Sequence, residues 1–157
     1  MTDRDGYWGA KIVASFSDAQ IGAAVDAANY DDPRARDFIV RHLIVRRDKV
    51  ARHWFERVAP LDFFRVEDGV LRFHDLAVDL DLAPGRGYDV EMEVTGGPDH
   101  GTGHVSLTGT EMSLNSLGAG ATRLSLRISV AGNGASPAHV ELTRVGSEWT
   151  VTRLRHG

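Results

Sequence analysis

The sequence contains no cysteine and only five prolines in 157 residues. Without cysteine the chain can form no disulfide, thiolate nucleophile or cysteine-ligated zinc site. It also lacks any apolar run near the roughly 18 residues that a membrane-spanning helix needs, and its N-terminus lacks a signal-peptide pattern. We therefore expect no membrane span.

The chain also has no large excess of charge of one sign, since it contains 18 Lys and Arg and 22 Asp and Glu. A free-standing nucleic-acid-binding domain is typically basic, and the run Arg46-Arg47-Asp48-Lys49 has no interleaved aromatic residues. We therefore expect no nucleic-acid partner. With 42% hydrophobic and 25% charged residues, the chain has the composition of an ordinary globular protein that is long enough to bury a core.

Apolar residues recur at helical spacing up to about Pro60. Residues 2–5 fit a helix start, Ser17 and Gln20 form a capping box, and Asp32 precedes a proline at a first helical position. These signals predict helices over about 2–13, 18–28 and 33–58. The longest carries two apolar stripes, which predict packing on two sides. The first stripe comprises Phe38, Ile39, Leu43, Val50 and Trp54, and the second comprises Val40, Ile44, Ala51 and Phe55.

After Pro60 the pattern alternates with period two, and glycines occupy turn positions. The predicted strands are 64–67, 70–74, 75–82, 88–95, 105–107, 112–114, 122–130, 140–142 and 149–151. Strand 105–107 is expected to pair with 112–114. The fold class is therefore α+β, with two short helices and a long one followed by an antiparallel β-sandwich of about eight strands. A barrel is the alternative. We expect a helical subdomain, 1–60, and a sandwich subdomain, 61–157, that unfold as one cooperative unit.

Acidic residues gather on the predicted strands 75–82 and 88–95. They are Asp75, Asp79, Asp81, Asp89, Glu91 and Glu93. Like charges on neighbouring strands are destabilising unless something compensates them. They could be solvated, they could face the basic third helix, or Asp79, Asp81, Asp89 and Glu91 could bind calcium, although no loop has calcium-binding spacing.

Two histidines form a second candidate metal site. His100 and His104 flank Gly101-Thr102-Gly103 and follow Asp99, so all three could contribute to a zinc site. The sequence indicates no further ligand, and solvated imidazoles on a glycine-rich hairpin are the alternative. His42 and His53 are interpreted as core or boundary residues of the long helix, because the pattern places no catalytic partner beside them.

Four stretches resemble the C-terminal region of larger, uncharacterised bacterial proteins whose upstream region is loosely kinase-like. They are RDGYWGAKIV (4–13), FSDAQI (16–21), RRDKVARHWFERVAPLDFF (46–64) and LRFHDLAVDL (71–80). The resemblance covers the first half of the chain. It implies an accessory domain of a longer protein, without assigned catalytic residues.

The leading functional hypothesis is a non-enzymatic binding or protein-interaction domain, whose partner is an upstream domain or another protein. A sandwich hosts many unrelated functions, so the fold does not indicate the ligand. The alternative is a metal-binding module or metal-dependent enzyme that uses His100 and His104 or the acidic strands. No cofactor is expected beyond the zinc or calcium of that alternative.

Overall fold

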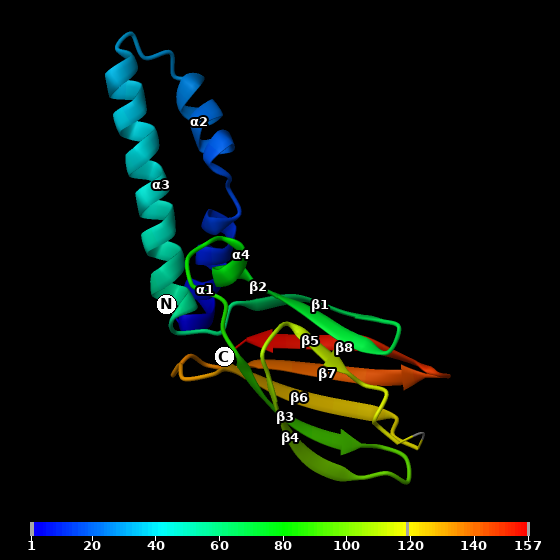
Figure 1. The fold of residues 1–157 in the computed structure, drawn as a ribbon. Helices are drawn as coiled ribbons and strands as arrows, with labels where there is room; N and C mark the ends of the chain where they lie inside the picture. The colour runs from blue at the N-terminus through cyan, green and yellow to red at the C-terminus, as the bar shows by residue number, and fades with distance from the viewer. Residues whose placement is uncertain (1, 119, 157) are drawn as a thin grey trace. The chain divides into compact units, whose positions relative to one another are not determined.

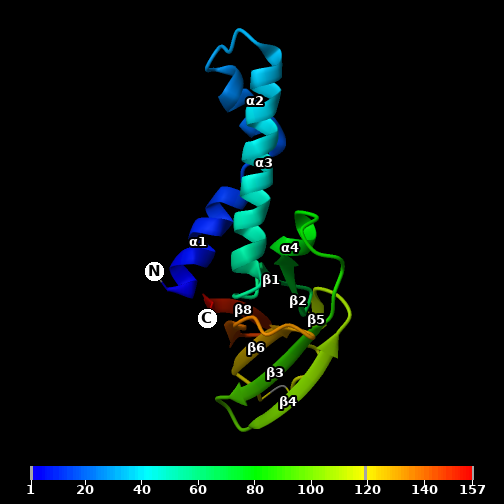
Figure 2. The same cartoon turned by 90° about the vertical axis from the view of Figure 1, so that its left-hand side faces the viewer.

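A computed structural model describes residues 2–118 and 120–156. The chain divides into two compact units, Met1–Phe55 and Glu56–Gly157. The first unit holds three helices, and the second holds eight strands and a short helix (Figures 1 and 2). The predicted α+β class, with helices first and antiparallel sheets after them, is confirmed.

The helical unit consists of α1 (Asp3–Ala14), α2 (Asp18–Asp26) and α3 (Pro33–Phe55). The predicted helix starts are confirmed, since the side chains of Thr2 and Ser17 each form a capping box. α3 ends three residues before the predicted Val58, because the backbone N–H of Ala59 donates to the carbonyl of Ser136 at 2.8 Å instead of continuing the helix. No helix in the described part of the chain has the length and apolarity to cross a membrane.

α1 and α2 lie one after the other along α3 (Figures 1 and 2). Near the C-terminal end of α3, the rings of Tyr7 and Phe55 are 5.9 Å apart, and both side chains are buried. Near its N-terminal end, Arg36 donates to both carboxylate oxygens of Asp26 at 2.7 and 2.9 Å. These hydrogen bonds lower the pKa of the Asp26 carboxyl.

The two apolar stripes of α3 have different environments. Ala51 and Phe55 of the second stripe are 0% and 2% exposed. In the first stripe, Phe38, Leu43 and Val50 are 54%, 41% and 40% exposed. Trp54, at the end of the first stripe, nevertheless lies close to Gly6 of α1, so the first stripe is exposed mainly in its earlier turns. The predicted packing of α3 on two sides stays a prediction.

The second unit contains eight strands and the short helix α4. The strands are β1 (Leu61–Glu67), β2 (Val70–Asp75), β3 (Tyr88–Thr95), β4 (Gly101–Leu107), β5 (Glu111–Ser113), β6 (Arg123–Val130), β7 (Ala138–Val145) and β8 (Glu148–His156). They form a three-stranded sheet in the order β1-β2-β5 and a five-stranded sheet in the order β4-β3-β6-β7-β8, all antiparallel. Asp68 and Gly69 connect β1 to β2 with φ angles of 52° and 72°, which suits the predicted two-residue hairpin.

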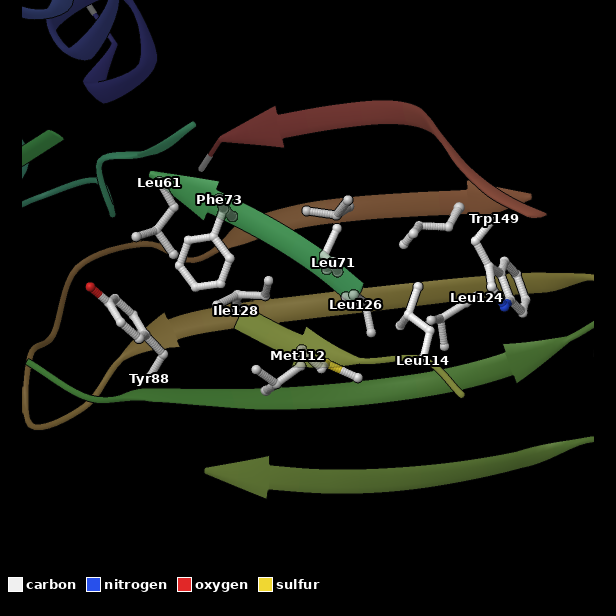
Figure 3. Packing of buried hydrophobic residues seen from close by; sticks show 14 of the residues in the cluster. Leu61, Leu71, Phe73, Tyr88, Met112, Leu114, Leu124, Leu126, Ile128 and Trp149 are labelled. Atoms are coloured by element: carbon white, nitrogen blue, oxygen red, sulfur yellow. The ribbon is translucent and has the colours of Figure 1, made fainter. Parts of the chain in front are cut away.

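The two sheets share one apolar core, as a sandwich requires. Leu71, Phe73 and Met112 from the smaller sheet belong to the same buried cluster as Leu126 and Ile128 from the larger one (Figure 3). The aromatic rings of Phe73 and Tyr88 meet edge to face across the sheets, with centroids 5.1 Å apart. The predicted sandwich therefore agrees with this arrangement.

Two strand predictions are wrong. Residues 75–82 form no strand beyond Asp75, because its side chain accepts a hydrogen bond from the backbone N–H of Ala77 at 3.0 Å and caps α4 (Leu76–Asp79). Residues 105–107 do not pair with 112–114. β4 pairs with β3 and β5 pairs with β2, so the link between them crosses from one sheet to the other.

Candidate functional site

Most of the large hydrophobic side chains that are exposed in the described residues lie on the helical unit. Of the twelve large hydrophobic side chains that are exposed among the described residues, nine belong to residues 1–55. Contiguous exposed apolar surface commonly marks an interaction site, whereas single exposed residues do not. An interaction site is therefore expected on α1, α2 and α3.

A groove of about 470 Å³ runs between these helices. Its apolar lining comes from the end of α1 and the residues after it, from one face of α2, and from the exposed stripe of α3. The lining side chains are Val13, Phe16, Ile21, Ala24, Leu43 and Val50. We call this surface the helical groove. Leu43 and Val50 are seven residues apart, so two turns of α3 present the same face to it.

The polar lining of the helical groove is mostly basic. Gln20, Arg46 and Arg47 complete its wall. Arg47 is held in place, because it donates to the carbonyl of Phe16 at 2.7 Å and pairs with Asp18 at 2.7 Å. Arg46 makes no ion pair with any described residue, so its charge remains free for a bound molecule.

The structure brings few potential metal ligands together at the predicted histidine site. His104 on β4 lies 3.8 Å from a carboxylate oxygen of Asp89 and directly across from Glu91 on β3. Asp99 instead accepts a hydrogen bond from the backbone N–H of Gly120 at 3.0 Å. His100 immediately precedes β4 and is exposed.

The four acidic residues proposed for calcium lie in two places. Asp79 belongs to α4 and bonds His74 Nδ1 at 2.8 Å, and Asp81 follows the same helix with a φ of 54°. Asp89 and Glu91 lie on β3, between β4 and β6. Among residues 2–118 and 120–156, no group of three or more His, Asp or Glu side chains is arranged to hold a metal ion. The metal-site hypothesis stays a prediction.

The charge on β3 is compensated by its neighbours in the sheet. The guanidinium of Arg127 on β6 donates to Glu91 at 3.0 Å. The hydroxyl of Ser106 on β4 donates to Asp89 at 2.9 Å. Compensation by Arg127 and Ser106 was not among the three possibilities drawn from the sequence. The sequence pattern predicted residues 75–82, rather than β6, as the strand beside β3.

A buried polar cluster at Asp75 was missed by the sequence analysis. The carboxylate of Asp75 is 1% exposed and accepts hydrogen bonds from Arg86 Nε, Arg86 Nη2, the Tyr88 hydroxyl and the backbone N–H of Ala77, at 2.7 to 3.0 Å. Burial, with the neighbouring Asp75 charge, raises the pKa of the Tyr88 hydroxyl. Because all four hydrogen bonds stay within the protein, the cluster positions α4 and the segment after it.

Comparisons with known proteins leave the function open. No protein-family model, no curated protein and no solved structure matches this chain. The helical groove is therefore the candidate site on its geometry alone. Leu43 and Val50 of the first apolar stripe were its sequence signal, but the sequence did not reveal that these two side chains stay exposed.

Proposed function

We propose that the helical unit is a protein-interaction module whose helical groove binds an amphipathic helix of a partner protein. The observation that carries the proposal is the exposure of Leu43 and Val50 on α3, which line the helical groove together with apolar side chains of residues 13–24. A bound helix would complete a layer beside α2 and α3. Apolar anchors spaced at i, i+3 or i+4, and i+7 match such a groove.

Charge indicates which kind of helix would fit. α3 carries seven arginines and lysines against two aspartates. Arg46 lines the helical groove without an acidic partner among the described residues. The bound helix should therefore carry aspartate or glutamate beside its apolar face, which favours association with the basic wall and disfavours basic competitors.

A displayed library of helical peptides tests the proposal, because selection from it does not require a named partner. Selection on the full chain should enrich amphipathic sequences with acidic flanks. Leu43→Gln should weaken the selected peptides at least tenfold, about 1.4 kcal/mol. Val45→Gln is the matched control, because Val45 is 49% exposed on the same helix but does not line the groove.

The charge argument has its own control. Arg46→Glu should weaken binding of the selected acidic peptides, while Arg41→Glu, which makes the same charge change outside the groove lining, should have little effect. Failure to enrich any helix, or equal binding to the Leu43→Gln and Val45→Gln variants, would contradict the proposal.

A further inference from the structure

In the part of the chain that the structure describes, the two sheets have four edge strands, and three of them carry features that oppose pairing with another chain. β5 is only three residues long. β1 is interrupted between Asp62 and Arg65, where Phe63 adopts a φ of 53°. β8 has a register shift opposite Glu141 and Leu142, and its His156 ring bonds the carbonyl of Leu61 on β1. Short length, bulges and covered ends are common ways of protecting an edge.

β4 has none of these features. It runs for seven residues, and its register with β3 is unbroken from Tyr88↔Leu107 to Val94↔Gly101. Its other side faces no described strand, as Figures 1 and 2 show. Its sequence, GTGHVSL, contains no proline, lysine or acidic residue. A regular edge of this kind presents unpaired backbone N–H and C=O groups to another strand.

We propose that β4 pairs antiparallel with β4 of a second copy of this chain, which joins the two larger sheets across a two-fold axis. With the axis at His104, Thr102 faces Ser106 of the other copy, and Gly103 faces Val105. Polar residues then meet polar residues on the outer face, and no Lys, Arg, Asp or Glu of one β4 faces such a residue on the other. A two-fold contact requires this kind of self-complementary surface.

Apolar side chains on the inner face of β4 and β3 also favour the pairing of β4 with another strand. Val105 and Leu107 point toward the core side of the sheet but are only half-buried, as is Met92 on β3. The Met92 side chain lies over Gly103, where an added Cβ would be 3.1 Å from its Cγ. A second β4 strand would extend this apolar face and remove more of it from water.

Sedimentation velocity of the full chain over a range of concentrations is the first test. We expect a reversible monomer–dimer equilibrium. Thr102→Lys/Ser106→Lys should weaken it at least tenfold, because lysines would then oppose each other across the axis. These lysines lie opposite Glu93 and Asp89 within the chain, so the fold should persist, as a melting curve will verify. Ser125→Lys/Thr150→Lys adds the same charge to the sheet away from β4 and should leave the dimer intact.

The absence of cysteine permits a second test. His104→Cys introduces one thiol at the proposed axis, where directly opposed residues of antiparallel strands approach within disulfide distance. Under mild oxidation it should form covalent dimers at least ten times faster than Thr150→Cys on β8.

Several results would overturn the proposal. One is a wild-type chain that remains monomeric up to about millimolar concentration, an outcome that would leave the edge to a strand of another protein. A dimer that persists in Thr102→Lys/Ser106→Lys would also overturn it, as would a dimer that is lost equally in the control Ser125→Lys/Thr150→Lys. Equal rates of cross-linking in His104→Cys and Thr150→Cys would do the same. Loss of the dimer in Leu43→Gln alone would place the contact on the helical groove instead.

Discussion

Asp75 and Arg86 form a two-point ion pair inside the sandwich unit, with Nε–Oδ2 and Nη2–Oδ1 distances of 2.7 and 2.9 Å. The Asp75 side chain is 1% exposed and that of Arg86 is 18% exposed. The pair connects the end of β2 to the segment that enters β3. Removal of one partner leaves the other charge poorly solvated, so this connection can be tested by substitution.

Replacing Asp75 by asparagine should strongly destabilise the protein. The variant keeps the shape of the side chain but leaves the Arg86 guanidinium without its counter-charge, at an expected cost of about 3–5 kcal/mol. Urea unfolding measures the change. Asp89→Asn, at a partly exposed position on β3, is the control and should cost about 1 kcal/mol or less. Equal losses in the two variants would show that the buried pair has no special importance.

Tyr88→Phe should reduce the loss of stability at alkaline pH. The pKa of the Tyr88 hydroxyl is raised in the folded state. The contribution of this hydroxyl to the free energy of unfolding is therefore complete below the unfolded tyrosine pKa of about 10, and it decreases as the pH rises above that value. Phenylalanine has no proton to lose. The free energy of unfolding of both proteins is measured between pH 8 and 11. The difference between the two proteins should be smaller at pH 11 than at pH 8. A difference that stays constant with pH would contradict the assignment.

Two glycines in α1 should respond oppositely to alanine. A Cβ on Gly6 would overlap the indole ring of Trp54, whereas a Cβ on Gly9 would enter open space. Gly9→Ala should raise stability by up to about 1 kcal/mol through helix propensity, and Gly6→Ala should lower it. Thermal melts followed separately for helix and strand signals measure both changes. If the two signals shift together in Gly6→Ala, the predicted cooperative unfolding holds, and if only the helix signal shifts, the units unfold independently.

Zinc and calcium should leave the melting temperature unchanged, because the described residues provide no third ligand at either proposed site. A metal that bound only the folded state would add about 2.7 kcal/mol at a concentration 100 times its Kd. Metal analysis of the purified protein complements the melt. A rise in melting temperature that disappears in His100→Ala/His104→Ala would instead establish the histidine site, and one that disappears in Asp89→Asn would implicate β3.

The sequence predicted those elements whose signals are local. The capping residues Thr2 and Ser17 marked their helices correctly, and Asp68-Gly69 marked its hairpin. Each signal depends on hydrogen bonds or φ angles within a few residues, so no distant partner could override it.

The errors arose where distant partners decide the outcome. Leu76, Val78, Leu80 and Leu82 alternate as a strand would, yet Asp75 begins a helical turn there and is itself bound by Arg86. The alternation of 105–107 and 112–114 fitted a hairpin equally well, but it cannot tell which sheet each strand joins. The helical groove was similarly hidden, because the sequence shows two apolar stripes on α3 without showing that Leu43 and Val50 stay exposed beside α2.

The hydrogen bond between His156 and Leu61 has a kinetic consequence. It joins positions 95 residues apart, so the contact between β8 and β1 requires closure of a long loop. Such contacts slow folding, whereas the helix pairs of residues 1–55 involve shorter separations. Refolding should therefore proceed in two time regimes, with the helical unit gaining its structure before the ends of the sandwich meet. The apolar residues of the helical groove would then be presented to other molecules while the β-sheets are still incomplete.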